Sequence, residues 1–323
     1  MVWQVDDLKL LHKDEKEVTD VIEWLKSEFK DKEIVKVKVS RWKKHNFLGM
    51  NFYFSDEGKV RVSIKEYVQD MIDTFPSKID KTATTPAALH SFKTINTVKL
   101  EENEAGKYHT ITAKGIFLCK RARTDIQTTS EFLTTSIKKP DKDDWKKLQK
   151  LLQYLNGTKD LDLILKANHL NILNWYIDTS HHIHPDFRSH TGGTMTMGKG
   201  GVYNNSIKQK LNTKSSTESE LVTVDDMMPH ILWTNTILKA QGFTTNDTII
   251  YQGNKSAIEK NGRMSSNKKT KHIGARYNFI RDYQEHGLVT VDNCPTDDII
   301  EDIFTKPLKG GKFQKFRKFI MNS

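Results

Sequence analysis

The chain has 323 residues, of which 36% are hydrophobic and 28% are charged, a balance typical of folded proteins and not of disordered chains. No run approaches the roughly 18 apolar residues of a membrane span, and the start lacks a signal peptide's basic region and apolar core, so we expect an intracellular protein with no membrane contact. The net charge of +10 favours a polyanionic partner such as nucleic acid, although an ordinary solvated surface stays an open alternative.

The first hundred residues are predicted to form a small α+β unit. Apolar residues at helical spacing between Val18 and Phe29 predict an amphipathic helix. Strand patterns follow at 34–42, 47–54 and 60–64, the last two joined by a turn at Asp56–Gly58, and a short helix runs to Phe75. Pro76 ends this unit, and the polar, aperiodic stretch that follows predicts a linker or extended strap.

The rest of the chain first shows a helical pattern and then alternates between strands and helices. Helical spacing dominates residues 108–158, with Gly157 as a stop signal. We then expect strands at 161–166, 172–178, 194–197, 202–208, 249–252 and 288–291, and helices at 216–240, 271–285, 297–304 and the C-terminus. These patterns predict an α/β unit over 161–323, preceded by a linker and helical connection over 76–160 and the α+β unit over 1–75.

Three acidic residues stand at separate topological points of the α/β unit. Asp178 ends a long apolar strand, Glu220 sits in the first turn of the long helix, and Asp302 lies among the last helices. Each alone has an ordinary explanation as a turn former, a helix-dipole partner or a surface acid. Together they are the kind of arrangement in which a sheet and its helices gather oxygen ligands for two hard cations.

Longer blocks around these acids resemble the ribonuclease H region of copia-type LTR retrotransposon Pol polyproteins. The matching blocks, in family order, are Asp178–Ser180, Arg188–Gly193, Lys208–Glu220, Thr270–Ile273 and Asp302–Leu308. Upstream, Phe47–Met50, Arg121–Ile126 and Tyr154–Thr158 are similar to the segment that joins reverse transcriptase to ribonuclease H. The resemblance covers nearly the whole chain and is more specific than any lone motif.

The resemblance implies an α/β fold with a ribonuclease H-like domain, a mixed five-stranded sheet with helices, over 161–323. It also implies that residues 1–75 are an incomplete α+β remnant of a reverse transcriptase palm and thumb. Val5-Asp6-Asp7 is similar to the polymerase motif Tyr-x-Asp-Asp, with Asp6 and Asp7 as two of its three metal-binding acids. We expect the third acid to belong upstream of Met1, so polymerase activity is not expected.

The same resemblance implies catalytic and metal-binding roles for Asp178, Glu220 and Asp302, with Mg²⁺ as cofactor in a two-metal site or Mn²⁺ in its place. We favour Glu220 over Glu218 because it fills the family's ligand slot, while Glu218 points about 200° around the helix. No small-molecule cofactor is expected.

One ligand position departs from the family pattern. The family's fourth acid lies in a Gln-Asp-Asn triplet, where this chain has Gln252-Gly253-Asn254. Glycine offers no side-chain oxygen, so the ligand is lost at Gly253, and we expect a rate lower by about a thousandfold or more. About two apolar residues of the family are also missing between Ile258 and Glu259. Restoring an acid by Gly253→Asp is expected to raise cleavage if this loss is the cause.

A basic cluster is the candidate contact for an RNA–DNA hybrid. Lysines, a histidine and an arginine lie just before and within one predicted helix, namely Lys268, Lys269, Lys271, His272 and Arg276. They are candidates for phosphate contacts, since such hybrids are recognised chiefly by backbone shape and 2′-hydroxyls. A second lysine cluster at 138–150 is a weaker candidate. The hypotheses are therefore an impaired hybrid-cutting ribonuclease and a catalytically dead nucleic-acid-binding remnant.

Overall fold

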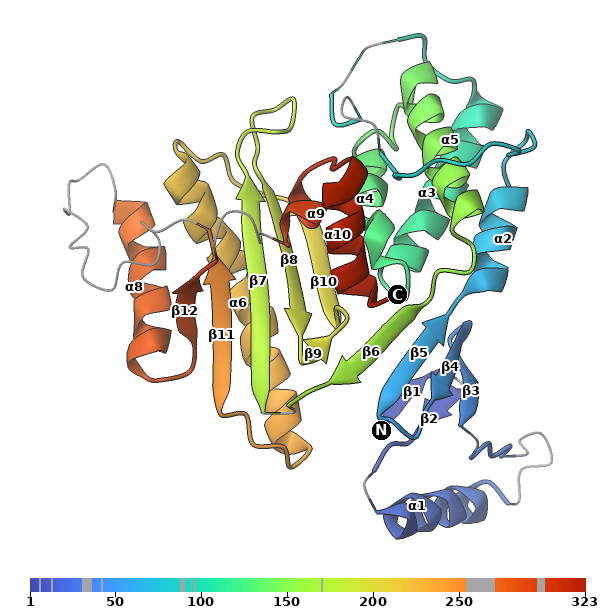
Figure 1. The fold of residues 1–323 in the computed structure, drawn as a ribbon, viewed down its shortest axis with the longest axis vertical. Helices are drawn as coiled ribbons and strands as arrows, with labels where there is room; N and C mark the ends of the chain where they lie inside the picture. The colour runs from blue at the N-terminus through green and yellow to red at the C-terminus, as the bar shows by residue number, and fades with distance from the viewer. Residues whose placement is uncertain are drawn as a thin grey trace.

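The structure is a computed structural model of the chain. It describes residues 1–323 apart from 6, 13, 31–36, 42, 88–90, 94, 96, 170, 254–270 and 295–299, and it leaves the side chains of 271–275 and 277 undescribed. The protein is an α/β molecule in which two mixed groups of strands and helices lie side by side (Figure 1). None of the described helices is long and apolar enough to cross a membrane.

The N-terminal part combines hairpins with two helices. Its elements are β1 (Val2–Gln4), β2 (Asp7–Lys9), α1 (Glu15–Glu28), β3 (Lys44–Phe47), β4 (Met50–Phe54), β5 (Lys59–Ser63) and α2 (Lys65–Asp73). Helix α1 confirms the predicted amphipathic helix, with Ile22 and Leu25 buried. Asp14 caps it by accepting a hydrogen bond from the Lys16 N–H at 2.9 Å, the usual role of an N-cap carboxylate.

Two predictions for this region are wrong. The segment 47–54 was expected to be one strand, but Leu48 and Gly49, at φ 52° and 74°, form a two-residue turn between β3 and β4. Two successive positive φ angles are the geometry that joins antiparallel strands most tightly. Of the expected strand at 34–42, residues 31–36 and 42 lie outside the described residues and 37–41 form no strand, because no described strand pairs with them.

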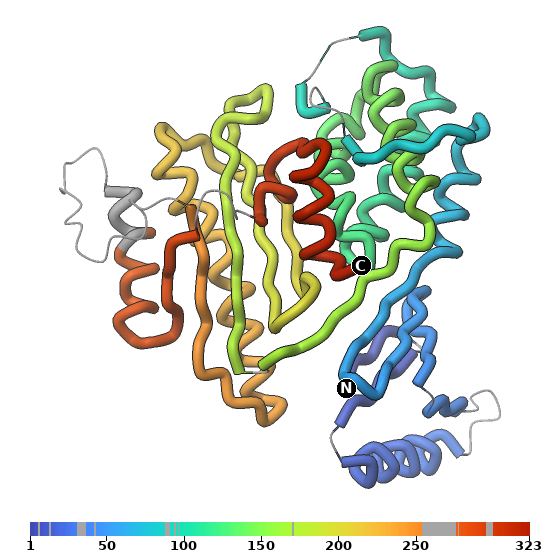
Figure 2. Tube along the Cα trace, in the orientation of Figure 1, coloured from blue at the N-terminus to red at the C-terminus, as the bar shows by residue number. Residues whose placement is uncertain are grey.

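The middle of the chain is a helical layer crossed by a strap. Its helices are α3 (Glu102–Cys119), the 3₁₀ turn η1 (Thr124–Ile126), α4 (Gln127–Thr135) and α5 (Lys142–Gly157). The chain before α3 runs across these helices (Figure 2). It is held by backbone bonds from Ala83 N–H to the Gln153 carbonyl at 3.2 Å and from Lys142 N–H to the Val98 carbonyl at 3.0 Å.

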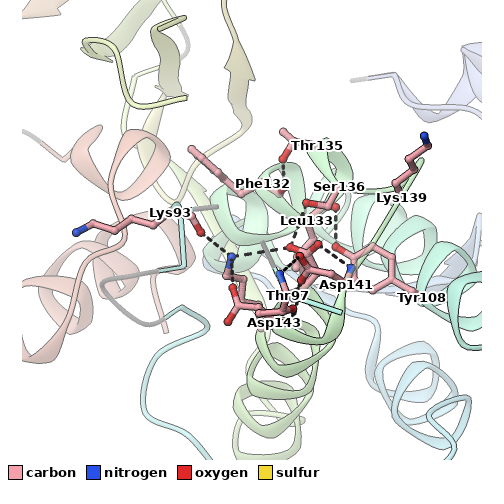
Figure 3. Close-up of polar contacts among 12 residues, drawn as sticks. Lys93, Thr97, Tyr108, Phe132, Leu133, Thr135, Ser136, Lys139, Asp141 and Asp143 are labelled. Carbon is pink, nitrogen blue, oxygen red and sulfur yellow. Dashed lines mark hydrogen bonds and ion pairs between the residues drawn. The ribbon is translucent and has the colours of Figure 1, made fainter. Parts of the chain in front are cut away.

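The start of α5 anchors this strap. Asp141 forms a capping box with Asp144, and its carboxylate also accepts a hydrogen bond from the Thr97 N–H at 3.2 Å. The Lys147 ammonium donates to the Lys93 carbonyl at 2.8 Å and pairs with Asp143 at 2.8 Å (Figure 3). The predicted linker is thus fastened to the helices by specific contacts at both ends of α5.

The second half supplies the other strands and helices. These are β6 (Leu163–Ala167), β7 (Ile172–Ser180), β8 (His190–Thr196), β9 (Gly198–Lys199), β10 (Tyr203–Lys208), α6 (Ser216–Ala240), β11 (Asp247–Gln252), α8 (Lys271–Glu285), β12 (Thr290–Asn293), α9 (Asp302–Thr305) and α10 (Gly310–Met321). Among the described strands, one sheet has the order β10-β8-β7-β11-β12. Strands β7, β8 and β10 are antiparallel neighbours, whereas β11 runs parallel to both β7 and β12.

The other described five-stranded sheet, β3-β4-β5-β6-β9, crosses the predicted boundary at residue 160. Strand β6 was expected to belong with the second half, yet it pairs with β5, with Val62 opposite Leu163. Helix α10 also returns to the N-terminal core, where Phe313, Phe316 and Ile320 are buried. A second core lies between the β7 sheet and α6 and contains Trp175 and Met227. The two halves therefore share structure across the predicted boundary.

Candidate functional site

Asp178 lies near the carboxyl end of β7, the central strand of the second sheet, with helix α9 beside it (Figure 1). Its side chain is buried, and the Thr305 hydroxyl donates to Oδ2 at 2.7 Å. The Lys306 ammonium is 3.5 Å from the same oxygen. Burial raises the pKa of Asp178, the Lys306 charge opposes that rise, and the nearby Asp302 adds to it.

Asp302 is the first residue of α9 and is also buried. Lys306, one turn later, pairs with one of its oxygens, and Lys312 from α10 pairs with the other. Asp178 and Asp302 therefore share one ammonium group although they come from distant parts of the sequence. Burial lowers the pKa of Lys306, but the two carboxylates outweigh it and the net direction is upward.

Glu220 reaches the same region from α6. Gln252, the last residue of β11, donates from Nε2 to Glu220 Oε2 at 2.9 Å. Burial, reinforced by the Asp178 charge, raises the pKa of Glu220 to about 8. Glu218 has a different task, since its carboxylate accepts the Lys214 N–H at 2.7 Å just before the helix.

Glu301, which the sequence analysis did not single out, adds a fourth carboxyl group. Its side chain is fully buried, and neither carboxyl oxygen has a hydrogen-bond partner among the described residues. Burial raises its pKa well above the ordinary value, and Asp178, Asp302 and Glu220 push it in the same direction. In the sequence it is only an acid next to Asp302, and its burial becomes visible only in the folded structure.

A chain of buried polar groups holds α9 against the sheet. His184 Nε2 lies 3.0 Å from His190 Nδ1, and His190 Nε2 lies 2.8 Å from the Ser206 hydroxyl, which donates to the Phe304 carbonyl at 2.7 Å. The Thr128 hydroxyl from α4 donates to the Ile303 carbonyl at 2.5 Å. These bonds fix the backbone of the helix that carries Asp302.

Gly192 allows α9 to approach strand β8 closely. It lies opposite Asp178 in the sheet, and a Cβ atom there would be 2.4 Å from Thr305 Cγ2 and 2.9 Å from Phe304 Cβ. A larger residue would push away the threonine that bonds Asp178. This close approach is a structural reason for the glycine in the Arg188–Gly193 block.

The donor set fits a hard divalent cation, because it consists of carboxyl oxygens and includes two orphaned ones on Glu301. The groups are not arranged as a finished coordination shell. Within the described part of the chain, no three or more His, Cys, Asp or Glu residues are placed so that they could hold a metal ion together. Lysines instead neutralise the two aspartates, so a cation would have to displace Lys306.

The predicted ligand gap lies beside this cluster. The parallel pairing of β11 with β7 sets Gln252 opposite Ile177, so one residue further Gly253 comes level with Asp178. Gly253 is exposed and carries no side-chain oxygen. Asn254 and the predicted two-residue deletion after Ile258 lie outside the described residues.

The remaining predicted site residues are not gathered at the acidic cluster in the described structure. Asp7 is exposed at the start of β2, and Asp6 lies outside the described residues. Arg276 on α8 pairs with Asp225 on α6 at 2.9 Å. Lys268 and Lys269 lie outside the described residues, and Lys271 and His272 begin α8 with undescribed side chains.

The second lysine cluster is partly engaged within the chain. Lys147 is only 9% exposed and bonds the strap, and Lys142 pairs with Glu104 at 2.5 Å. In Figure 3, Lys139 projects away from the network around Asp141. Lys147, with its ammonium occupied, is a poor candidate for phosphate contact, so the expectation for this cluster is weakened.

Comparison with known proteins gives a consistent family relationship. The chain is 26% identical over 268 residues to the retrovirus-related Pol polyprotein from transposon TNT 1-94 of Nicotiana tabacum, which covers 81% of this chain and 20% of that protein. It is 28% identical over 284 residues to the corresponding polyprotein from transposon RE2 of Arabidopsis thaliana, covering 85% of this chain and 19% of that one. No family model matches the chain.

A yeast relative extends the relationship beyond plants. A Saccharomyces cerevisiae protein ascribed to transposon Ty5-1 is 24% identical over 187 residues, which is 57% of this chain and 60% of that protein. The chain spans about a fifth of the length of the plant polyproteins. It is a homologue of the retrovirus-related Pol polyproteins of plant and yeast transposons, as expected for a fragment of a copia-type Pol polyprotein.

Proposed function

We propose that the unit built on β7 is a ribonuclease H-like domain that cuts the RNA strand of an RNA–DNA hybrid. The observation that carries the proposal is the convergence of Asp178 and Asp302 on Lys306, with Glu220 in the electrostatic field of Asp178. The similarity to the plant Pol polyproteins also supports this proposal, because the matches cover most of this chain.

In this proposal Asp178, Glu220 and Asp302 hold Mg²⁺ in a two-metal site, with Mn²⁺ as a substitute. The bound cations would supply an activated water and stabilise the leaving oxygen. Thr305 orients the Asp178 carboxylate and Gln252 orients Glu220 through the hydrogen bonds described above. Lys306 and Lys312 keep the aspartates neutralised in the absence of a cation.

Gly253 weakens this activity within the proposal. It stands where a further carboxylate would lie beside Asp178, so one anionic ligand is absent from that position. For substrate contact we retain Lys268, Lys269, Lys271, His272 and Arg276 as the proposed contacts to the phosphates of the hybrid. Arg276 would have to exchange its contact with Asp225 for a phosphate.

The N-terminal part fits the proposal as the end of a reverse transcriptase joined to the helical connection. Asp6 and Asp7 would then be polymerase-derived residues without a polymerase role in this chain. This assignment rests on the match with the Pol polyproteins over most of the chain.

Nucleic-acid binding without cleavage is the second candidate function. It is favoured by the two lysines that occupy the aspartates and by glycine at position 253. If binding depends on phosphate neutralisation, the logarithm of the affinity for a hybrid falls linearly with the logarithm of the salt concentration. An affinity that does not change with the salt concentration would contradict this alternative.

A cleavage assay separates the two candidates. A hybrid with a fluorescently labelled RNA strand is incubated with the protein and Mg²⁺ or Mn²⁺. We expect cleavage that Asp178→Asn removes, because that carboxylate is the buried centre of the proposed cation site. Asp160→Asn, at an exposed surface pair, is the matched control and should leave cleavage unchanged. Binding without cleavage above the Asp178→Asn background would contradict the ribonuclease proposal.

A further inference from the structure

Glu301 is a buried charge-bearing group that neither the fold nor the proposed ribonuclease site accounts for. It is fully buried, and both of its carboxyl oxygens lack a hydrogen-bond partner among the described residues. A buried carboxyl group left without partners is costly, so its presence needs a reason. The completed contacts of Asp178 and Asp302 show that this part of the fold can satisfy buried acids.

The pairing register shows which face of the sheet Glu301 approaches. Tyr176 lies opposite Tyr251, and their rings stack at 4.9 Å, so both project from the same face. Two residues later on each strand, Asp178 and Gly253 belong to that face as well. Because glycine has no side chain, the position beside Asp178 lacks a carboxylate from β11.

Glu301 approaches this face from the N-cap position directly before α9. Thr305, four residues after Glu301, bonds Asp178 at 2.7 Å, and residues four apart share one side of a helix. The Glu301 carboxyl group interacts electrostatically with Asp178, Asp302 and Glu220, and also with Tyr176 on the same face of β7. The Glu301 carboxyl group is therefore within electrostatic reach of these acids, while its own oxygens have no hydrogen-bond partner among the described residues.

We propose that Glu301 supplies the carboxylate that Gly253 lacks and acts as a further ligand for the divalent cation at Asp178 and Asp302. The inference rests on the proposed ribonuclease site and deepens it, and it replaces the weakening ascribed above to Gly253 with a loss that Glu301 compensates. The carboxylate that β11 does not provide would come from the residue directly before α9. On this basis Gly253→Asp alone adds a surplus carboxylate, and its benefit appears only when Glu301 is removed.

Direct titration of the full chain with Mn²⁺ tests the proposal without relying on catalysis. The protein is first freed of metal with a chelator, which is then removed. Mn²⁺ is added, its affinity is measured by calorimetry, and the bound Mn²⁺ is counted by electron paramagnetic resonance. We expect Glu301→Gln to weaken Mn²⁺ binding by about tenfold or more, the scale of effect known for groups around a metal site. Glu285→Gln, at an exposed pair with Arg281, is the control and should leave the affinity unchanged.

The double variant Gly253→Asp/Glu301→Gln keeps the test decisive if Glu301→Gln disturbs packing. Recovered Mn²⁺ affinity in the double variant supports a ligand role. Unrecovered affinity together with a wild-type melting temperature in chelator overturns it.

Asp178→Asn distinguishes failure of this inference from failure of the proposed function. If Asp178→Asn abolishes Mn²⁺ binding while Glu301→Gln leaves it unchanged, Glu301 is not a ligand and the proposed site stands. If Glu301→Gln weakens binding but the wild-type protein leaves a hybrid uncut, the inference stands and the ribonuclease proposal fails. A wild-type protein that binds no Mn²⁺ overturns both.

Discussion

Two buried charged clusters in this protein are built in opposite ways. Around Arg123 and Asp125, the guanidinium contacts both carboxylate oxygens at 2.8 and 2.9 Å, and it also donates to the Thr158 carbonyl and hydroxyl. The Tyr154 hydroxyl donates to Asp125 at 2.6 Å. Around Asp178 the acids are not completed in this way, because the Glu301 carboxyl oxygens have no hydrogen-bond partner in the described part of the chain and the Asp178 charge raises the pKa of Glu220.

The difference separates a cluster that the protein completes from one that leaves carboxyl groups unsatisfied. The Arg123 cluster is completed by the protein itself and needs nothing from solvent, as expected for a group that fixes one packing arrangement. The acidic cluster of Asp178, Glu220, Glu301 and Asp302 contains more carboxyl groups than its lysines pair with, and burial raises the pKa of Glu220 and Glu301 because their ionised forms are costly there. A binding partner of positive charge would complete it, so the two clusters should respond differently to divalent cations.

Breaking the completed cluster should have the largest effect on stability. Arg123→Met leaves Asp125 buried without its partner, and breaking such a pair costs about 3–5 kcal/mol of unfolding free energy. Urea denaturation should show the same loss in chelator and in Mg²⁺, because no cation site is involved. Lys65→Met, at the exposed pair with Asp160, is the control for a simple loss of surface charge. A loss at Arg123 that Mg²⁺ repairs would contradict the comparison.

Low pH should reduce the stability of the buried polar chain that begins at His184 and holds α9 beside the acidic cluster. Burial, together with the Lys208 charge, lowers the pKa of His184 to about 4. An unfolded histidine takes up its proton near pH 6.5, so between pH 6.5 and 4 the unfolded state binds more protons and stability falls as pH falls. The expected loss from this residue is on the order of 3 kcal/mol.

Comparing the pH dependence of wild type and His184→Gln isolates that contribution. The variant lacks the titrating ring, so its urea midpoint should fall less steeply between pH 6.5 and 4 than that of the wild type. Equal slopes would mean that the bond from His184 to His190 does not control the support of α9.

Local sequence patterns were sufficient to predict most elements of both regions. Helix α5 follows from its apolar spacing and from the acids in its first turn, and α6 and α8 begin and end where the spacing indicated. The β3–β4 turn was missed because its first residue, Leu48, gives no sign of a positive φ angle, and Gly49 alone did not mark the turn. The partner of β6 was missed because spacing predicts a strand and not the strand with which it pairs.

The site was only partly predictable for a related reason. The resemblance pointed to Asp178, Glu220 and Asp302, which lie at strand and helix positions that a linear pattern can mark. Glu301 looks in sequence like a surface acid beside Asp302, and only three-dimensional packing shows that it is fully buried. The counterion role of Lys306 likewise depends on its contact with Asp178 on β7, and that of Lys312 on the contact between α10 and α9.

A side chain at position 192 should test whether the close packing of α9 on β8 keeps Thr305 bonded to Asp178. The new Cβ in Gly192→Ala would meet Thr305 Cγ2 at 2.4 Å and Phe304 Cβ at 2.9 Å, and overpacking of this kind costs about 1–3 kcal/mol. Thermal denaturation should show the loss, and calorimetry should show weaker Mn²⁺ binding because Thr305 moves from Asp178. Gly106→Ala, in α3 with no atom within 4 Å of the new Cβ, should instead gain about 0.5–1 kcal/mol.

Removing the Lys306 ammonium should change the stability least, yet it tests most directly whether the acidic cluster around Asp178 and Asp302 binds a cation. Lys306→Met removes the ammonium shared by Asp178 and Asp302, and because the side chain is 41% exposed we expect a loss of only about 1 kcal/mol in chelator. Mg²⁺ should then bind without displacing a lysine and restore the melting temperature more strongly than in the wild type, since a ligand that binds the folded state stabilises it by mass action. Equal Mg²⁺ responses in both proteins would show that Lys306 does not compete with the cation. The cluster would then resemble the Arg123 cluster more closely than its unpartnered oxygens indicate.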